Sequence, residues 1–245
     1  MKAKRVLVEG KEVSKPSSSV SVDAAISIIP ADEYVSRAGL KLKGALDAFG
    51  EIDVVGKCCL DIGASTGGFT DVLLRHGASR VIAIDVGHDQ FSAELAANPR
   101  VQSFEGVNAR ELTLDQLRKL TGDPKLEIDL VVADLSFISL TLVLPALAKL
   151  VNSADFILLI KPQFEVGKQS LSASGVVSDH RLRAAAIRQV VECCDDLGLR
   201  VLGLERSKLV GTHGNTEYLI WISTDKVPNR SIWTERIEQL AREGK

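Results

Sequence analysis

The chain has 245 residues, of which 45% are hydrophobic and 25% are charged, a balance typical of an ordinary globular protein. Its apolar runs are much shorter than the roughly 20 residues that a membrane helix needs, and its charged start, residues 1–5, is not followed by the apolar core of a signal peptide. We therefore expect a cytoplasmic protein without membrane contact.

The four cysteines form two adjacent pairs, at 58–59 and 193–194. Neither pair has the spacing of metal ligands, and no histidine lies at a zinc-site distance from them. We expect buried, reduced thiols and no metal site. The formal net charge of −2 does not by itself indicate a nucleic-acid partner.

The first 30 residues contain patterns of short strands and turns. Residues 5–8 alternate, residues 9–11 suit a hairpin turn, and residues 25–29 form another short apolar run. Residues 1–50 hold eight Lys/Arg and six Asp/Glu, so this end is slightly basic, which is compatible with contact to phosphates. So small a piece cannot bury a core of its own. We expect an appendage at 1–30 and one main domain at 31–245.

The main domain is expected to begin with a helix that Ser36 caps and that ends at Gly50. From residue 58, short β-type runs alternate with helical patterns, which predicts a largely parallel sheet with helices on both faces. The last two strands have no helix between them and should pair antiparallel. The fold class is therefore α/β, with a Rossmann-like seven-stranded sheet. The expected strands are 58–62, 81–85, 101–104, 130–133, 156–160, 201–204 and 218–222, and the expected helices are 68–76, 89–97, 113–121, 139–151 and 180–197.

A glycine-rich turn, LDIGASTGGFTD at residues 60–71, lies where the first of these strands runs into a helix. Glycines there let the backbone turn tightly and let a ligand lie against it. A turn without a ligand is the alternative, but the spacing is that of neither a nicotinamide dinucleotide site nor an ATP P-loop.

Two carboxylates and an amide extend this motif into a binding site. Asp61 is placed to reach the amino-acid end of S-adenosylmethionine, Asp85 to bind its ribose hydroxyls, and Asn108 to approach its adenine. We therefore predict S-adenosylmethionine as the cofactor and a methyltransferase-like variant of the doubly wound fold. The predicted cofactor contacts are Asp61, Gly63, Ala64, Ser65, Thr66, Gly67, Gly68, Phe69, Asp85, Val86, Asn108, Ala109 and Asp134.

Four ionisable residues form a candidate catalytic group: Lys41, Asp134, Lys161 and Glu217. Because the carboxyl ends of parallel strands open onto one crevice, Asp134 and Lys161 should face the methyl group of the cofactor. Each residue alone could be a solvated lysine or a helix-capping carboxylate. Together they suit the removal of a proton from a hydroxyl group. We predict Lys161 as the base, with Lys41 favouring its neutral form and with the two carboxylates orienting the lysines.

Five strings in this sequence closely resemble the TlyA family, whose members are ribosomal RNA 2′-O-methyltransferases with an FtsJ-like catalytic domain and are often labelled hemolysins. The resemblance covers residues 6 to about 222, and it implies ribosomal RNA or a ribosomal subunit as partner and the family's Lys-Asp-Lys-Glu tetrad at Lys41, Asp134, Lys161 and Glu217. The strings are YVSRAGLKL (34–42), DIGASTGGFTD (61–71), DLSFIS (134–139), KPQFE (161–165) and HGNTE (213–217).

The chain departs from the family pattern in two places. Family members usually begin with a complete S4 RNA-binding module, and residues 5–29 resemble only its final strands, so residues 1–30 are expected to be a partial S4-like RNA-binding segment. Ala38 stands where the family commonly has glycine, which is a mild change.

Two other functions are compatible with parts of the sequence. A methyltransferase acting on a small molecule or a base would share the fold, but amine or carbon targets have less need of a lysine base. A membrane-active hemolysin would need an amphipathic or apolar membrane segment, and none is evident. Aromatic residues make up only 4% of the chain, and Phe137 and Phe164 are the candidates for stacking on a base near the crevice. The sequence does not indicate an oligomeric state.

Overall fold

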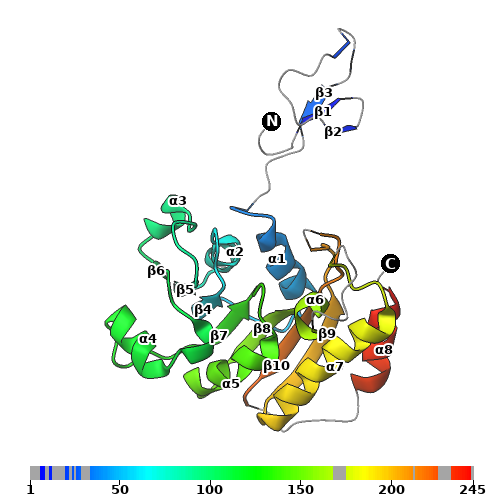
Figure 1. Ribbon diagram of the computed structural model, residues 1–245. Coiled ribbons are helices and arrows are strands. Elements are labelled where there is room, and N and C mark those ends of the chain that lie inside the picture. Colours follow the sequence, from blue (N-terminus) through cyan, green and yellow to red (C-terminus); the bar gives the residue numbers. More distant parts are fainter. Residues whose placement is uncertain are drawn as a thin grey trace.

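Figure 1 shows the computed structural model of the protein. The structure describes residues 6–8, 11–12, 20–21, 24, 26–28, 34–167, 175–211, 213–225 and 233–243.

A seven-stranded sheet in the order β6-β5-β4-β7-β8-β10-β9 forms the centre of the molecule. Strands β4 to β8 pair in parallel, and β10 runs antiparallel between β8 and β9. The predicted α/β sheet is confirmed, and each strand ends within two residues of its expected position. The strands are β4 (Cys58–Ile62), β5 (Arg80–Ile84), β6 (Val101–Phe104), β7 (Leu130–Ala133), β8 (Asp155–Ile160), β9 (Arg200–Arg206) and β10 (Tyr218–Ser223).

Helices cover both faces of this sheet (Figure 1), which explains why central strands such as β7 and β8 are nearly continuous apolar runs. One hydrophobic core joins the sheet to α1, α2 and α3, and the other joins it to α4, α5, α7 and α8. The helices are α1 (Ala38–Ala48), α2 (Gly68–Arg75), α3 (Ala93–Ala96), α4 (Leu114–Thr121), α5 (Leu140–Leu150), α6 (Pro162–Glu165), α7 (His180–Asp196) and α8 (Trp233–Glu243), with a 3-10 turn η1 at Ala109–Glu111.

The start of α1 differs from the expectation, because Ser36 is not its cap. The cap position is occupied by Arg37, without a side-chain capping bond, and the Ser36 carbonyl accepts a hydrogen bond from the Gly39 amide at 3.1 Å. The Ser36 hydroxyl instead lies against α2, where a Cβ added to Gly68 would come within 2.2 Å of it. Packing against α2 therefore takes the place of the expected cap.

The helix expected at 89–97 is also wrong in extent, because only Ala93–Ala96 is helical. The backbone amides of Asp89, Gln90 and Phe91 donate to the carboxylate of Glu105 instead. Side-chain acceptors of this kind compete with helical hydrogen bonds for the same amides. The segment before α3 is therefore a loop fastened to the end of β6.

Three short strands near the N-terminus form a second, antiparallel sheet in the order β2-β1-β3. They are β1 (Val6–Val8), β2 (Lys11–Glu12) and β3 (Ile26–Ile28). Strands β1 and β3 lie within the expected runs, whereas β2 was not expected and begins at Lys11, which was expected to belong to the turn. The turn residues Glu9 and Gly10 lie outside the described residues. The assignment of residues 1–30 to a partial S4-like segment stays a prediction.

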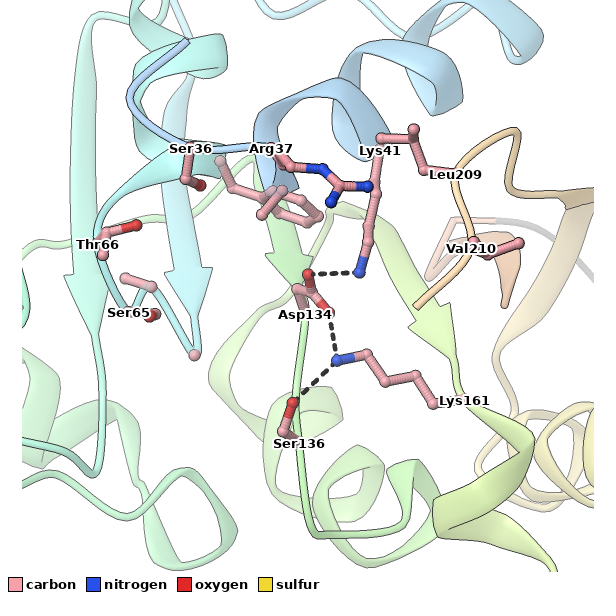
Figure 2. A pocket seen from close by; sticks show the side chains of 14 residues that line it. Ser36, Arg37, Lys41, Ser65, Thr66, Asp134, Ser136, Lys161, Leu209 and Val210 are labelled. Atoms are coloured by element: carbon pink, nitrogen blue, oxygen red, sulfur yellow. Dashed lines mark hydrogen bonds and ion pairs between the residues drawn. The ribbon is translucent and has the colours of Figure 1, made fainter. Parts of the chain in front are cut away.

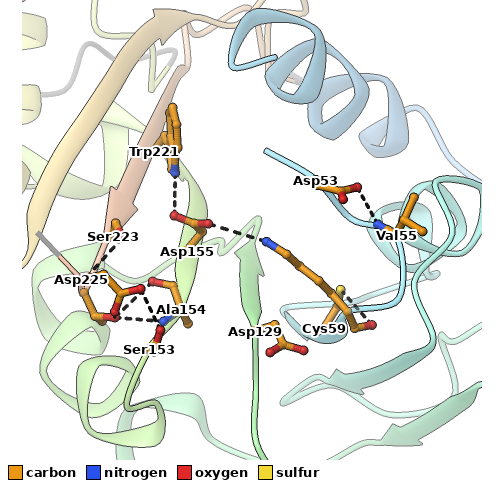
Figure 3. A network of polar contacts seen from close by, with 12 residues as sticks. Asp53, Val55, Cys59, Asp129, Ser153, Ala154, Asp155, Trp221, Ser223 and Asp225 are labelled. Carbon is orange, nitrogen blue, oxygen red and sulfur yellow. Dashed lines mark hydrogen bonds and ion pairs between the residues drawn. The ribbon is translucent and has the colours of Figure 1, made fainter. Parts of the chain in front are cut away.

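A polar network connects the amino-terminal ends of the central parallel strands (Figure 3). Asp155, at the start of β8, accepts a hydrogen bond from Trp221 Nε1 at 3.0 Å, and its other oxygen lies 3.7 Å from Lys57 Nζ. Asp129 accepts a hydrogen bond from the Cys58 amide at 2.8 Å. These contacts join the amino-terminal ends of neighbouring strands. The predicted site residues lie at the opposite, carboxyl-terminal ends of the parallel strands.

Candidate active site

The four predicted catalytic residues meet at the carboxyl ends of β7 and β8. Lys161 Nζ lies 2.7 Å from Asp134 Oδ1, and Lys41 Nζ lies 3.2 Å from Asp134 Oδ2. Figure 2 shows the two lysines approaching Asp134 from different sides. Lys41 Nζ also lies 2.7 Å from Glu217 Oε2. The four side chains therefore form one row in which positive and negative groups alternate.

Burial gives this row its electrostatic character. The side chain of Glu217 is only 2% exposed and that of Lys161 only 8% exposed, so the charges interact with little screening by water. Burial disfavours the Lys41 ammonium, but the carboxylates of Asp134 and Glu217 outweigh this effect, and the pKa of Lys41 lies above its ordinary value. Lys41 is therefore the fixed cation of the group.

A close approach of α1 to α2 brings Lys41 over the site. A Cβ added to Gly39 would lie 2.9 Å from the Gly68 carbonyl oxygen, and one added to Gly68 would lie 3.0 Å from the Gly39 nitrogen. Any side chain at either position would push the two helices apart. Lys41 lies two residues beyond Gly39 in the same helix, so this contact helps to place its side chain at Asp134.

Glu165 fastens together the two loops that carry Asp134 and Lys161. Its buried carboxylate accepts hydrogen bonds from the Leu140 amide, at 2.9 Å, and from the Ser139 hydroxyl, at the start of α5. Burial raises the pKa of Glu165. Sequence reasoning missed this residue as part of the site, because its position in the KPQFE string does not show which loop it contacts.

A cavity of about 610 Å³ lies beside this group, within the size range of small-molecule sites. The Asp85 carboxylate lines this cavity and accepts hydrogen bonds from the backbone amides of Ser65 and Gly87, each at 2.7 Å. Its oxygens keep further lone pairs that could accept from ribose hydroxyls. Apolar side chains such as Val107 and Ile138 offer faces for an adenine ring. This donor set fits S-adenosylmethionine.

Most of the predicted cofactor contacts line the cavities around this site. Those lining the 610 Å³ cavity are Gly63, Ser65, Asp85, Val86, Asn108, Ala109 and Asp134. Ala64, Thr66 and Phe69 line a smaller neighbouring cavity.

Asp61, Gly67 and Gly68 line neither of these two cavities. Gly67 and Gly68 shape the turn, since a Cβ on Gly67 would lie 2.4 Å from Leu95. Asp61 is buried beneath the turn and accepts a hydrogen bond from the Thr70 hydroxyl at 2.7 Å. Burial raises the pKa of Asp61 to about 7. Contact between Asp61 and the cofactor stays a prediction.

The smaller cavity, of about 260 Å³, has Lys41, Asp134 and Lys161 in its wall. It shares Gly63, Ser65, Asp134 and Ser136 with the larger cavity, so a molecule in one would lie next to a molecule in the other. The shared wall is where the reacting groups of two substrates could meet. Sequence reasoning did not single out Arg37, Leu209 and Val210, which also line the smaller cavity.

Phe137 stands out beside the site. Its side chain is 90% exposed, and its backbone has a φ of +66°, an unusual conformation for a bulky residue. Its ring lies 5.3 Å from that of Phe164, and Lys161 Nζ lies 5.9 Å from the centre of the Phe164 ring. The two predicted stacking residues therefore form one aromatic surface next to the lysine.

Comparisons with known proteins identify the family of the chain. The family of FtsJ-like methyltransferases matches residues 34–224. The 16S/23S rRNA (cytidine-2′-O)-methyltransferase TlyA of Mycobacterium tuberculosis is 45% identical over 225 residues, which are 91% of this chain and 81% of that protein. Hemolysin A of Brachyspira hyodysenteriae is 40% identical over 216 residues, which are 87% of each chain.

A solved structure from Streptococcus thermophilus that carries a hemolysin label has a TM-score of 0.83 and 34% identity, and it covers 99% of this chain and 86% of that chain. These matches confirm the predicted family and, with it, S-adenosylmethionine as the cofactor. The chain is a TlyA-type member of the FtsJ-like methyltransferases.

Proposed function

We propose that the protein transfers a methyl group from S-adenosylmethionine to a ribose 2′-hydroxyl of ribosomal RNA. The observation that carries the proposal is the position of Asp134, which lies in the wall of both cavities and pairs with both lysines. The relatives named as ribosomal RNA 2′-O-methyltransferases support the choice of substrate. A ribosomal substrate would place the protein in the cytoplasm, as expected from the sequence.

Proton transfer in this proposal depends on Lys161. When bound, S-adenosylmethionine supplies an electrophilic methyl group to the 2′-oxygen. Lys161 Nζ, in its neutral form, accepts the hydroxyl proton and becomes an ammonium ion that Asp134 stabilises. Lys41 remains charged throughout, held by Asp134 and Glu217.

The surroundings of the smaller cavity suit a nucleotide. Arg37 is exposed at its rim and can pair with a phosphate. Phe137, which lines the neighbouring larger cavity, and Phe164 offer ring faces to a base that has left its stack. We further propose that residues 1–30 contribute to RNA binding as a partial S4-like segment.

The test is transfer of labelled methyl groups from S-adenosylmethionine to purified small and large ribosomal subunits. Loss of a general base lowers rates by about 10² to 10⁴-fold, so we expect a drop of that order for Lys161→Ala. The control is Lys149→Ala, which removes an exposed lysine of α5 and should leave transfer unchanged. Label on a base, or on neither subunit while S-adenosylmethionine binds, would refute the ribose assignment.

A membrane-active function is the second candidate, because Hemolysin A is a relative. Within the described residues, no helix is both long and apolar enough to cross a membrane. Lysis of red cells by purified Lys161→Ala protein would favour this candidate, since it would be independent of methyl transfer. Absence of lysis by the wild-type protein would count against it.

A further inference from the structure

The carboxylate of Glu105 captures three consecutive backbone amides. Oε2 accepts from Asp89 at 2.7 Å, and Oε1 accepts from Gln90 at 3.0 Å and from Phe91 at 3.2 Å. Asp89 has a φ of +58°, in the left-handed region that few residues adopt. An unusual backbone conformation of the loop is therefore fixed by a single side chain.

Glu105 lies between two walls of the 610 Å³ cavity. One wall is formed by residues 85–87, which precede the captured loop, and by residue 90, which belongs to it. The other wall is formed by residues 107–110, which follow Glu105 in the chain. Backbone hydrogen bonds continue the connection, from Gly106 to the Gly87 carbonyl at 3.1 Å and from Val107 to the Asp85 carbonyl at 2.9 Å. The spacing of the two walls thus depends on contacts centred on Glu105.

We propose that Glu105 is a positioning residue for the cofactor, one that holds the Asp85 loop at the correct distance from the Asn108 turn before S-adenosylmethionine binds. This inference rests on the proposed function, because it takes the 610 Å³ cavity to be the cofactor site. Glu105 does not line that cavity itself. It acts through the backbone of the loop, so its effect should fall on affinity rather than on the chemical step.

The expected size follows from the population of the competent loop. If the loop without its acceptor keeps the bound-like geometry about one tenth of the time, the apparent Kd rises about ten-fold. Glu105→Gln retains one side-chain oxygen and should weaken binding less than Glu105→Ala, which removes every acceptor. The matched control is Glu111→Gln, since Glu111 carries the same charge, is exposed, and follows the second wall without lining the cavity.

The experiment is calorimetric titration of each full-length variant with S-adenosylmethionine and with S-adenosylhomocysteine. We expect the Kd for both ligands to rise in the order wild type, Glu105→Gln, Glu105→Ala, with Glu111→Gln matching wild type. Methyl transfer should show a raised KM for S-adenosylmethionine and an unchanged kcat, and the amides of residues 89–91 should exchange hydrogen faster in Glu105→Ala.

Three results would overturn the inference: an unchanged Kd in Glu105→Ala, an equal rise in Glu111→Gln, or a fall in kcat without a change in KM. If the wild-type protein bound neither ligand, the proposed function itself would fail. If the wild-type protein bound both ligands but the variants did so equally well, only the role of Glu105 would be refuted.

Discussion

Asp61 should make the stability of this protein depend on pH in a direction opposite to that of most carboxylates. Its side chain is buried below the glycine-rich turn, one oxygen accepts the Thr70 hydroxyl, and the other has no hydrogen-bond partner among the described residues. Because burial disfavours the charged form, the pKa of Asp61 is raised from 3.8 to about 7. The substitution Asp61→Asn replaces it with a side chain that cannot ionise.

The magnitude follows from proton linkage. The folded protein keeps a proton on Asp61 that the unfolded chain releases above about pH 4, so folding becomes less favourable as pH rises from that value to about pH 7, and the cost is constant above it. Between pH 5 and pH 8 this change amounts to about 2 to 3 kcal/mol. The free energy of unfolding of Asp61→Asn relative to wild type should therefore increase by about that amount.

Urea unfolding of the ligand-free protein at several pH values between 5 and 8 measures this difference. The control is Asp115→Asn, which removes an exposed carboxylate of α4 and should give a constant offset from wild type. A constant offset for Asp61→Asn as well would show that Asp61 is ionised over the whole range, and the argument from burial would be wrong.

Two further predictions concern the placement of the candidate catalytic groups. Glu165→Gln should lower turnover about ten- to a hundred-fold by loosening two catalytic loops, without changing S-adenosylmethionine binding in calorimetry, and unaltered turnover would contradict the role given to Glu165. Gly39→Ala should destabilise the protein by about 1 to 3 kcal/mol through overpacking against Gly68 and should reduce methyl transfer. The control is Gly44→Ala, in the same helix with open space around it, which should be neutral or stabilising by up to about 1 kcal/mol. Thermal unfolding measures both substitutions. Equal effects would show that packing against Gly68 is not the cause.

The sheet and the tetrad could be predicted from the sequence because their signals are local. Buried strands such as β7 and β8 are uninterrupted apolar runs, and a parallel sheet brings the residues that follow such runs to one edge. Asp134 and Lys161 follow directly from this rule. The rule does not place Lys41 or Glu217, because Lys41 lies in a helix and Glu217 precedes a strand that runs antiparallel to the others. Their assignment to the same group relied in addition on the family resemblance.

The remaining features depend on contacts between distant segments. The short α3 reflects the capture of three amides by Glu105, which lies 14 to 16 positions away. Glu165 acts on α5 across 25 or 26 positions. Helix α8 was not expected at all, although Ile237, Leu240 and Ala241 are buried in the core, because its stability comes from packing against α7 and β9.

The reversed direction of β10 determines which groups can join the candidate catalytic row. Tyr218, the first residue of β10, pairs with Ile160, the last residue of β8, so Glu217 enters the sheet beside Lys161. In a strand of the same length running the other way, a residue at its start would lie at the far edge, about 20 Å from the lysines. The antiparallel direction of β10 therefore lets Glu217, at the beginning of a strand, join Asp134 and Lys161, which follow strand ends. In a protein with an entirely parallel sheet, the residue in this position would instead have to follow the end of the strand, so in a newly found sequence the direction of this one strand indicates where to search for the second carboxylate.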